Sequence, residues 1–187
     1  MTILNISDCS LNSIDVGNSS LKELTFHKVK INNGIVLPTT ITKLYVHDVI
    51  HKNDIRNLEN CLVVVLDLWS VRISTPVKPS NLICNSLKRL ASYRSFVDGI
   101  ENASKNITYL YYFVDNSCNK SKRQIVDILN SCLFLVEFVL WHYKDILLTL
   151  PSTITYLFCG FCDVSKLLNL KSLNLLSEIE FSTSIGA

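Results

Sequence analysis

The stretch Leu21-Lys-Glu-Leu24-Thr-Phe26-His-Lys-Val29-Lys-Ile31 decides the fold, because it reads L-x-x-L-x-F-x-x-V-x-I. Its fourth and sixth positions are apolar and alternate with polar residues, which is the period of a short β-strand with one buried face. We therefore expect a strand around Leu24 and Phe26, with both side chains in the core.

The same phrase recurs along the chain and defines nine candidate repeats. They begin at Met1, Leu21, Ile41, Val63, Leu87, Ile107, Leu135, Ile154 and Leu176. Successive starts lie 19 to 28 residues apart, a spacing typical of arrays whose units bury their apolar faces against each other. A rival start at Leu170 would shorten the eighth repeat to 16 residues, so we prefer Leu176.

Position four is apolar in all nine repeats, whereas positions six and nine follow the pattern less strictly. Position four holds Leu4, Leu24, Leu44, Leu66, Leu90, Leu110, Phe138, Leu157 and Ile179. Position six holds Ile6, Phe26, Val46, Leu68, Ser92, Tyr112, Leu140, Cys159 and Phe181. Position nine holds Cys9, Val29, Val49, Val71, Ser95, Asp115, Tyr143, Cys162 and Ser184, without a column of asparagines. The register is weakest in the fifth and sixth repeats, where a slip by one residue is open.

On these residues the chain resembles a leucine-rich-repeat protein over essentially its whole length. Two segments, Leu37-Pro-Thr-Thr-Ile-Thr-Lys-Leu44 and Leu150-Pro-Ser-Thr-Ile-Thr-Tyr-Leu157, are similar to the FNIP-type variant of that repeat. Their prolines are expected to turn the chain into the next strand, where a missing N–H is harmless. The resemblance implies one α/β solenoid over residues 1–187. Its parallel sheet would line the concave face, with short helices or extended turns on the convex face.

The segments between the strands differ in length and in expected structure. Residues 32–40 have room only for extended chain or a tight turn, whereas residues 121–132 form the best helix. That helix would bury Ile125, Ile128, Leu129 and Cys132. Asn53 and Asp54 could cap a short helix with Ile55, Leu58 and Leu62 inward, and Asp163 could open another. Polar caps are not evident at either end, so the end repeats are self-capped or the chain belongs to something longer.

Composition argues against several classes of function. A net charge of +2 disfavours a nucleic-acid binder, and no basic cluster exceeds Lys120-Ser-Lys122-Arg123, which disfavours a membrane-surface binder. The N-terminus lacks a signal-peptide pattern, and the uncharged run 146–162 contains Pro151 and is too short to span a membrane. Seven cysteines without paired spacing, including an isolated Cys159-x-x-Cys162, favour reduced thiols in a cytoplasmic protein over a zinc site.

The sequence gives no indication of catalysis or of a cofactor. It contains no G-x-S-x-G, glycine-rich phosphate loop or H-E-x-x-H, and Asp67, Glu137, Glu178 and Glu180 are best interpreted as a solvated face. His27 and His47 could share a metal with Asp48, but these are too few ligands for a metal prediction. We therefore expect no enzyme activity.

Position seven, expected just past the strand, carries the candidate binding residues. It should face solvent, and six consecutive repeats place a ring there: His27, His47, Trp69, Tyr93, Phe113 and Trp141. Position five adds Tyr45, Tyr111 and Phe158, and position three adds Tyr109 and Tyr156. Exposed aromatic side chains often mark protein-binding surfaces. Rings on neighbouring strands can also stack as a purely structural ladder, and both interpretations are open.

The expected function is recognition of another protein on the concave face, without catalysis. Two alternatives are a targeting or regulatory repeat segment of a larger enzyme, and a structural repeat fragment with no ligand. The sequence defines neither the partner's identity nor the oligomeric state.

Overall fold

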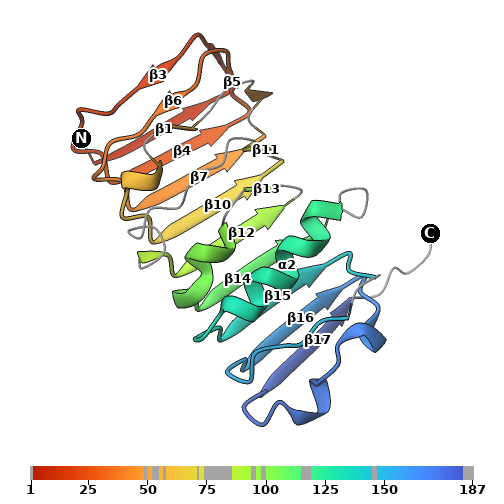
Figure 1. The fold of residues 1–187 in the computed structure, drawn as a ribbon. Helices are drawn as coiled ribbons and strands as arrows, with labels where there is room; N and C mark the ends of the chain where they lie inside the picture. Colours follow the sequence, from red (N-terminus) through yellow and green to blue (C-terminus); the bar gives the residue numbers. More distant parts are fainter. Residues whose placement is uncertain are drawn as a thin grey trace.

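The dominant feature of the computed structural model is a parallel sheet of nine strands. The structure describes residues 2–48, 50–51, 55–56, 58–70, 72–73, 86–93, 96–97, 100–114, 119–144 and 147–182. The strands are β1 (Ile3–Ser7), β4 (Glu23–His27), β7 (Lys43–His47), β10 (Val65–Trp69), β12 (Arg89–Tyr93), β14 (Tyr109–Phe113), β15 (Glu137–Trp141), β16 (Tyr156–Gly160) and β17 (Glu178–Ser182). Figure 1 shows them side by side in chain order, and the sheet does not close on itself.

The pairing of the strands confirms the predicted register. Every strand occupies positions three to seven of its phrase, and position four pairs with position four of the next strand throughout. Leu90 pairs with Leu110, so the fifth and sixth repeats do not slip. Leu157 pairs with Ile179, which confirms the start at Leu176 over the rival start at Leu170.

Positions four and six form the core of the sheet, as predicted, except at its two ends. In β4 to β16 these side chains are at most 4% exposed, from Leu24 and Phe26 to Leu157 and Cys159. In β17, Phe181 is 48% exposed and Ile179 is exposed too, whereas Leu4 and Ile6 of β1 are half-buried. The end strands have a neighbour on one side only, so their core-facing side chains are less covered than those of the inner strands.

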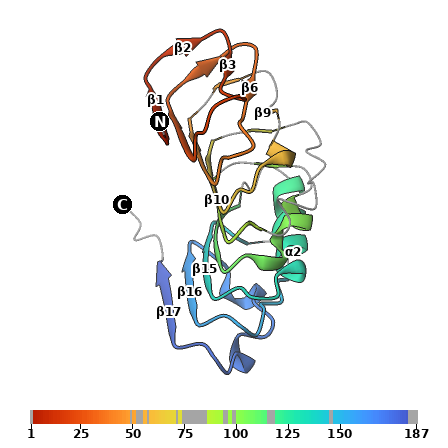
Figure 2. The ribbon, with the colours of Figure 1, turned by 90° about the vertical axis from the view of Figure 1, so that its left-hand side faces the viewer.

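The return segments use little helix. Short strands form two three-stranded sheets and a pair: β2 (Ser10–Leu11), β5 (Lys30–Ile31) and β8 (Ile50–His51); β3 (Ile14–Asp15), β6 (Ile35–Val36) and β9 (Ile55–Arg56); β11 (Arg72–Ile73) and β13 (Phe96–Val97). The helical elements are η1 (Leu58–Asn60), η2 (Ile100–Asn106), α2 (Asn119–Ser131), η3 (Val164–Lys166) and η4 (Leu170–Ser172). Figure 2 shows the main sheet along one side and α2 along the other. The fold is thus mostly parallel β, with few helices. Within the described residues no helix is long and apolar enough to cross a membrane.

The helix predictions were only partly right. Helix α2 buries Ile125, Ile128 and Leu129 as expected, and Cys132, directly after its last residue, is buried too. The prediction of a short helix with Ile55, Leu58 and Leu62 inward was wrong. Ile55 belongs to β9, where its backbone pairs with Ile35 of β6. Leu58 is buried in η1, but Leu62 is exposed. The proposed caps Asn53 and Asp54 lie outside the described residues. The predicted cap Asp163 does open η3, and its Oδ1 accepts the Ser165 N–H at 3.1 Å.

The L-P-[ST]-[ST]-I-T segments make the turns expected of them and also tie each strand to the strand before it. Ile41 N–H donates to the Pro38 carbonyl at 3.2 Å, and Ile154 N–H to that of Pro151 at 3.3 Å. In each segment a threonine hydroxyl reaches back to the first residue of the preceding phrase: Thr40 to the Leu21 carbonyl at 2.7 Å and Thr153 to the Leu135 carbonyl at 2.6 Å.

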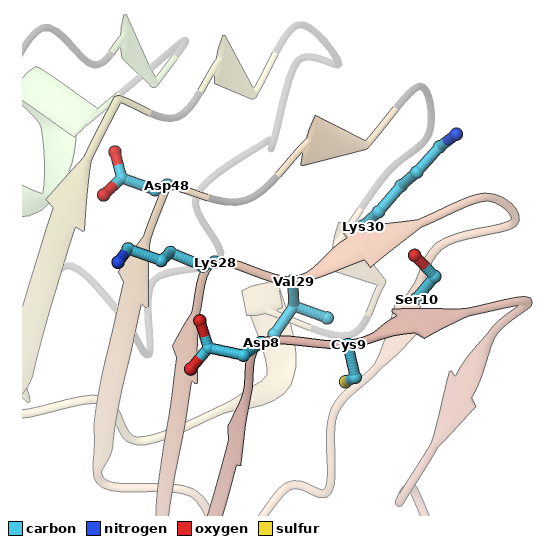
Figure 3. Close-up of a pocket in the computed structure, with 7 residues that line it drawn as sticks. All are labelled: Asp8, Cys9, Ser10, Lys28, Val29, Lys30 and Asp48. Atoms are coloured by element: carbon cyan, nitrogen blue, oxygen red, sulfur yellow. The ribbon is translucent and has the colours of Figure 1, made fainter.

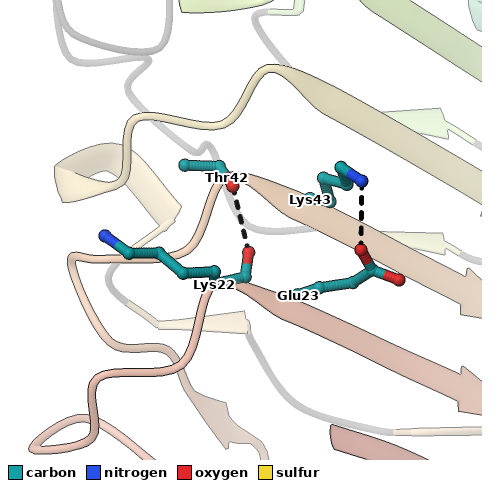
Figure 4. A network of polar contacts seen from close by, with 4 residues as sticks. All are labelled: Lys22, Glu23, Thr42 and Lys43. Atoms are coloured by element: carbon teal, nitrogen blue, oxygen red, sulfur yellow. Dashed lines mark hydrogen bonds and ion pairs between the residues drawn. The ribbon is translucent and has the colours of Figure 1, made fainter. Parts of the chain in front are cut away.

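One carbonyl per phrase gathers several donors at the start of each strand. The Lys22 carbonyl accepts the Thr42 N–H at 2.8 Å, the Lys43 N–H at 3.1 Å and the Thr42 hydroxyl at 3.2 Å (Figure 4). The Lys88 carbonyl receives the same three donors from Thr108 and Tyr109. The beginning of each strand is therefore fixed to its neighbour before the strand ladder starts.

Position eight, directly after the strand, is left-handed in six of the described phrases. Asp8, Lys28, Asp48, Ser70, His142 and Phe161 have φ between 49° and 58°. Each of these residues donates its N–H to the position-seven carbonyl of the next strand, as Ser70 does to Tyr93 at 2.7 Å. The left-handed conformation costs a non-glycine residue about 1–2 kcal/mol, which the ladder hydrogen bond and the burial of the following residue must offset. At position nine, Val49, Val71, Ser95, Asp115 and Ser184 lie outside the described residues, whereas Val29 and Tyr143 are buried.

Candidate functional site

The face of the main sheet that points away from the core is formed by positions three, five and seven of each phrase. We call it the open face. Its side chains alternate with the buried ones along every strand, because successive residues of a β-strand point to opposite sides. Every residue predicted to bind a partner lies on this face.

Rings from neighbouring strands contact each other along position seven. The ring centroids of His47 and Trp69 are 5.7 Å apart, those of Trp69 and Tyr93 are 4.6 Å apart and stacked, and those of Tyr93 and Phe113 are 4.3 Å apart. The register places these four residues on β7, β10, β12 and β14 in succession. The structure therefore brings the centre of the predicted stripe together.

Beyond Phe113 the contacts pass to position eight. Phe113 contacts His142, with ring centroids 4.6 Å apart, and His142 stacks on Phe161 at 4.9 Å. Trp141 packs against Phe158 at 5.0 Å and Phe161 at 5.8 Å. His142 and Phe161 were missed from the sequence. They join the rings because the left-handed turn redirects them.

The ring of Trp141 lies directly on Gly160. A Cβ added to Gly160 would lie 2.2 Å from Cε3 of that indole, so the glycine is needed for the close approach. The Trp141 Nε1 atom is buried there and has no hydrogen-bond partner among the described residues. The lack of a side chain at Gly160 thus decides where the Trp141 ring packs.

A second contact bridges two strands that are not neighbours. Trp69 on β10 and Tyr111 on β14 stack with centroids 6.0 Å apart, across the intervening β12. The residue of β12 at position five is Ala91, which is small and buried. Burial raises the pKa of the Tyr111 hydroxyl, and the neighbouring Tyr93, Tyr109 and Asp67 raise it further. We call the nine rings His47, Trp69, Tyr93, Tyr111, Phe113, Trp141, His142, Phe158 and Phe161 the ring cluster.

The predicted site residues differ in exposure. Trp69 is 37% exposed, and His27, Tyr45, His47, Tyr93, Tyr111, Trp141 and Phe158 are half-buried. Phe113 is only 7% exposed, so the expectation that it faces solvent was wrong; Tyr93 and His142 lie against it. His27 and Tyr45 share the face with the ring cluster but are not members of it.

The two histidines considered for a metal are neighbours, but their surroundings differ from the expectation. His27 pairs with His47 in the strand register, and His47 Nε2 lies 3.3 Å from Oδ1 of Asp67 rather than near Asp48. Within the described part of the chain no group of three His, Cys, Asp or Glu side chains could hold a metal ion.

Charged groups on the open face are paired at its N-terminal end. Lys43 Nζ lies 3.2 Å from a Glu23 carboxylate oxygen (Figure 4), and this hydrogen bond and the charge of Glu23 raise the pKa of Lys43. Near the middle, the Arg89 guanidinium lies 3.9 Å above the centre of the Tyr109 ring. At the C-terminal end Glu137, Glu178 and Glu180 are exposed, and none has an ion-pair partner among the described residues.

An open hollow lies beside the C-terminal ends of strands β1, β4 and β7. It is lined by Asp8, Cys9, Ser10, Lys28, Val29, Lys30 and Asp48. In Figure 3, the side chains of Asp8, Lys28 and Asp48 point to the same side. They come from three successive left-handed turns, and their order of acid, base and acid makes the charges alternate. The set contains no nucleophile–base pair, and we assign it no chemistry.

Comparisons of the chain with protein-family models, with curated proteins and with solved structures gave no match.

Proposed function

We propose that the chain is a leucine-rich-repeat solenoid, with segments of the FNIP type, that recognises another protein through its open face. The open face would be the concave side of the solenoid, and the recognition would involve no catalysis and no cofactor. The regular recurrence of the strand phrase supports the repeat assignment, and the ring cluster supports the recognition surface.

The exposure of Trp69 within the ring cluster carries this proposal. Stacking alone would be satisfied by rings that are fully covered, but Trp69 is 37% exposed, and the neighbouring Tyr93 and Tyr111 are half-buried. Tyrosine and tryptophan are favoured anchors of protein interfaces, and rings already held by their neighbours lose little freedom on binding. The cluster therefore offers a partner an aromatic surface that is ordered in advance.

The setting we propose is the cytoplasm. Cys9, Cys132, Cys159 and Cys162 are free thiols, two of them buried, as suits a protein in a reducing compartment. Cys84 and Cys118 lie outside the described residues.

The test compares Trp69→Ser with Phe134→Ser, which removes a similarly exposed ring away from the open face. Each variant and the wild type would be used for affinity capture from a lysate of the source, with quantitative mass spectrometry. We expect proteins that the wild type and Phe134→Ser retain and Trp69→Ser loses, with all three equally folded by circular dichroism. Equal capture by all three folded proteins would refute recognition through the ring cluster.

A further inference from the structure

The C-terminal part of the open face combines half-buried rings with carboxylates that have no ion-pair partner among the described residues. By register, position three runs Arg89, Tyr109, Glu137, Tyr156, Glu178 across five successive strands. Adjacent strands lie about 4.8 Å apart, so Tyr156 stands between two carboxylates roughly 10 Å from each other. Glu180, at position five of β17, adds a third carboxylate to this part of the open face and pairs in register with Phe158.

Elsewhere on the open face, Glu23 and Asp67 each have a nitrogen-bearing side chain within ion-pair distance. Glu23 has Lys43 at 3.2 Å, and Asp67 has His47 at 3.3 Å. Glu137, Glu178 and Glu180 have no such neighbour in the described ranges. Burial and the charges of Glu180 and Glu178 raise the pKa of Tyr156, as expected where the local potential is negative. A cation supplied by a partner would meet this unbalanced charge.

The chain itself contains a pattern for how such a cation would bind. The Arg89 guanidinium lies 3.9 Å above the Tyr109 ring, with Glu137 next in the row. Tyr156 occupies the same phrase position two strands further on. Its two neighbours in the row are Glu137 and Glu178, so a carboxylate stands where Tyr109 has its arginine. Phe158 adds a half-buried ring beside it. Arginine stacks on rings and pairs with carboxylates better than lysine does, because its guanidinium is planar and donates in a fork.

We propose that the partner presents an arginine-containing, basic segment to Tyr156, Phe158, Glu137, Glu178 and Glu180. The proposal rests on recognition through the open face and specifies the partner's chemistry. Long-range electrostatic attraction would not account for binding of a basic segment, because the whole chain carries a net charge of +2 and repels a basic peptide at long range. The affinity must come from the local arrangement of rings and carboxylates.

The experiment uses capped tetra-arginine and tetra-lysine peptides as probes, titrated calorimetrically into the full chain at low salt. We expect tetra-arginine to bind more tightly than tetra-lysine and added salt to weaken both. Removing two carboxylates with Glu178→Gln and Glu180→Gln together should weaken tetra-arginine binding roughly five- to tenfold. The matched control is Glu23→Gln, whose carboxylate already pairs with Lys43, and it should leave binding unchanged.

A ring variant completes the test. Tyr156→Leu should abolish the preference for arginine over lysine while keeping most of the salt dependence. Equal binding by the wild type and the double glutamine variant, or no preference for arginine in the wild type, would overturn the proposal. Its failure would be separate from failure of open-face recognition, because Trp69→Ser could still lose partners that the double glutamine variant retains.

Discussion

The contact between Trp141 and Gly160 makes a strong prediction about the ring cluster. In Gly160→Ala the new methyl group would lie 2.2, 2.5 and 2.7 Å from three atoms of the indole. Carbon atoms pack at about 3.5–4.0 Å, so the ring must withdraw by more than about 1 Å. Gly160 is extended rather than left-handed, so the indole alone opposes the substitution.

The expected cost is about 2–3 kcal/mol. Overpacking of this kind costs about 1–3 kcal/mol. The contacts of Trp141 with Phe158 and Phe161 are worth about 0.5–1.5 kcal/mol each when intact, so weakening both adds about 1 kcal/mol. Removing a glycine from a strand returns about 0.5–1 kcal/mol. In a chain of this length the melting temperature should fall by about 5–10 °C.

The assay is denaturant unfolding in a Trp69→Phe background, where Trp141 is the remaining tryptophan. Displacing the buried Nε1 into water should shift the native emission to longer wavelength. A double-mutant cycle with Trp141→Ala, followed by circular dichroism because that variant has no tryptophan, isolates the contact, since Gly160→Ala should then be neutral or slightly stabilising. The same loss of stability with and without the indole would refute the argument.

Two further predictions concern the core. Phe26→Ala should lower the free energy of unfolding by about 3–5 kcal/mol. Phe181→Ala is at the same phrase position but changes a side chain that is 48% exposed, so it should cost less than about half as much. Equal losses in thermal unfolding would contradict the exposure of Phe181. Burial raises the pKa of the Cys132 thiol to about 12, so in the folded protein at pH 8 iodoacetamide should label half-buried Cys9 but not Cys132, as checked by peptide mass spectrometry. Because that pKa lies above the value near 9 of the unfolded thiol, unfolding releases a proton between pH 9 and 12, and the free energy of unfolding should fall as pH rises through that window. Cys132→Ala should make this fall shallower, and an unchanged slope would contradict the assignment.

The strands could be predicted because their pattern is local and repeated. Leu24 and Phe26 give the alternation of a half-buried strand, and seven of the other eight phrases repeat it. The exception has Ser92 at position six, and there the register was settled by the strand pairing rather than by the sequence. The exposure of Ile179 and Phe181 could not be predicted, because their residue types and phrase positions match those of buried residues. Only the missing neighbouring strand distinguishes them.

The turns after the strands were harder to predict. Left-handed residues are usually recognised by glycine or asparagine, yet position eight holds Lys28, Ser70 and Phe161. All six left-handed residues donate their N–H to the next strand, but Val114 makes the same tertiary hydrogen bond without a positive φ, so the bond accompanies the left-handed turn without dictating it. The residues of the open face were predictable because the periodicity of the strands is local. The ring contacts through His142 and Phe161 were not, because they depend on the left-handed turn after the strand.

The donors that converge on one carbonyl at each strand's start, and the left-handed residue at its end, have a consequence for how such a chain can change. Both attachments lie next to the strand, so the alignment of the main strands does not require a fixed length of chain between them. Strand starts differ by as few as 19 and as many as 28 residues without disturbing the register, and the longest interval holds α2. Insertions and deletions can therefore accumulate behind the sheet, while the order and spacing of the residues on its open face stay constant.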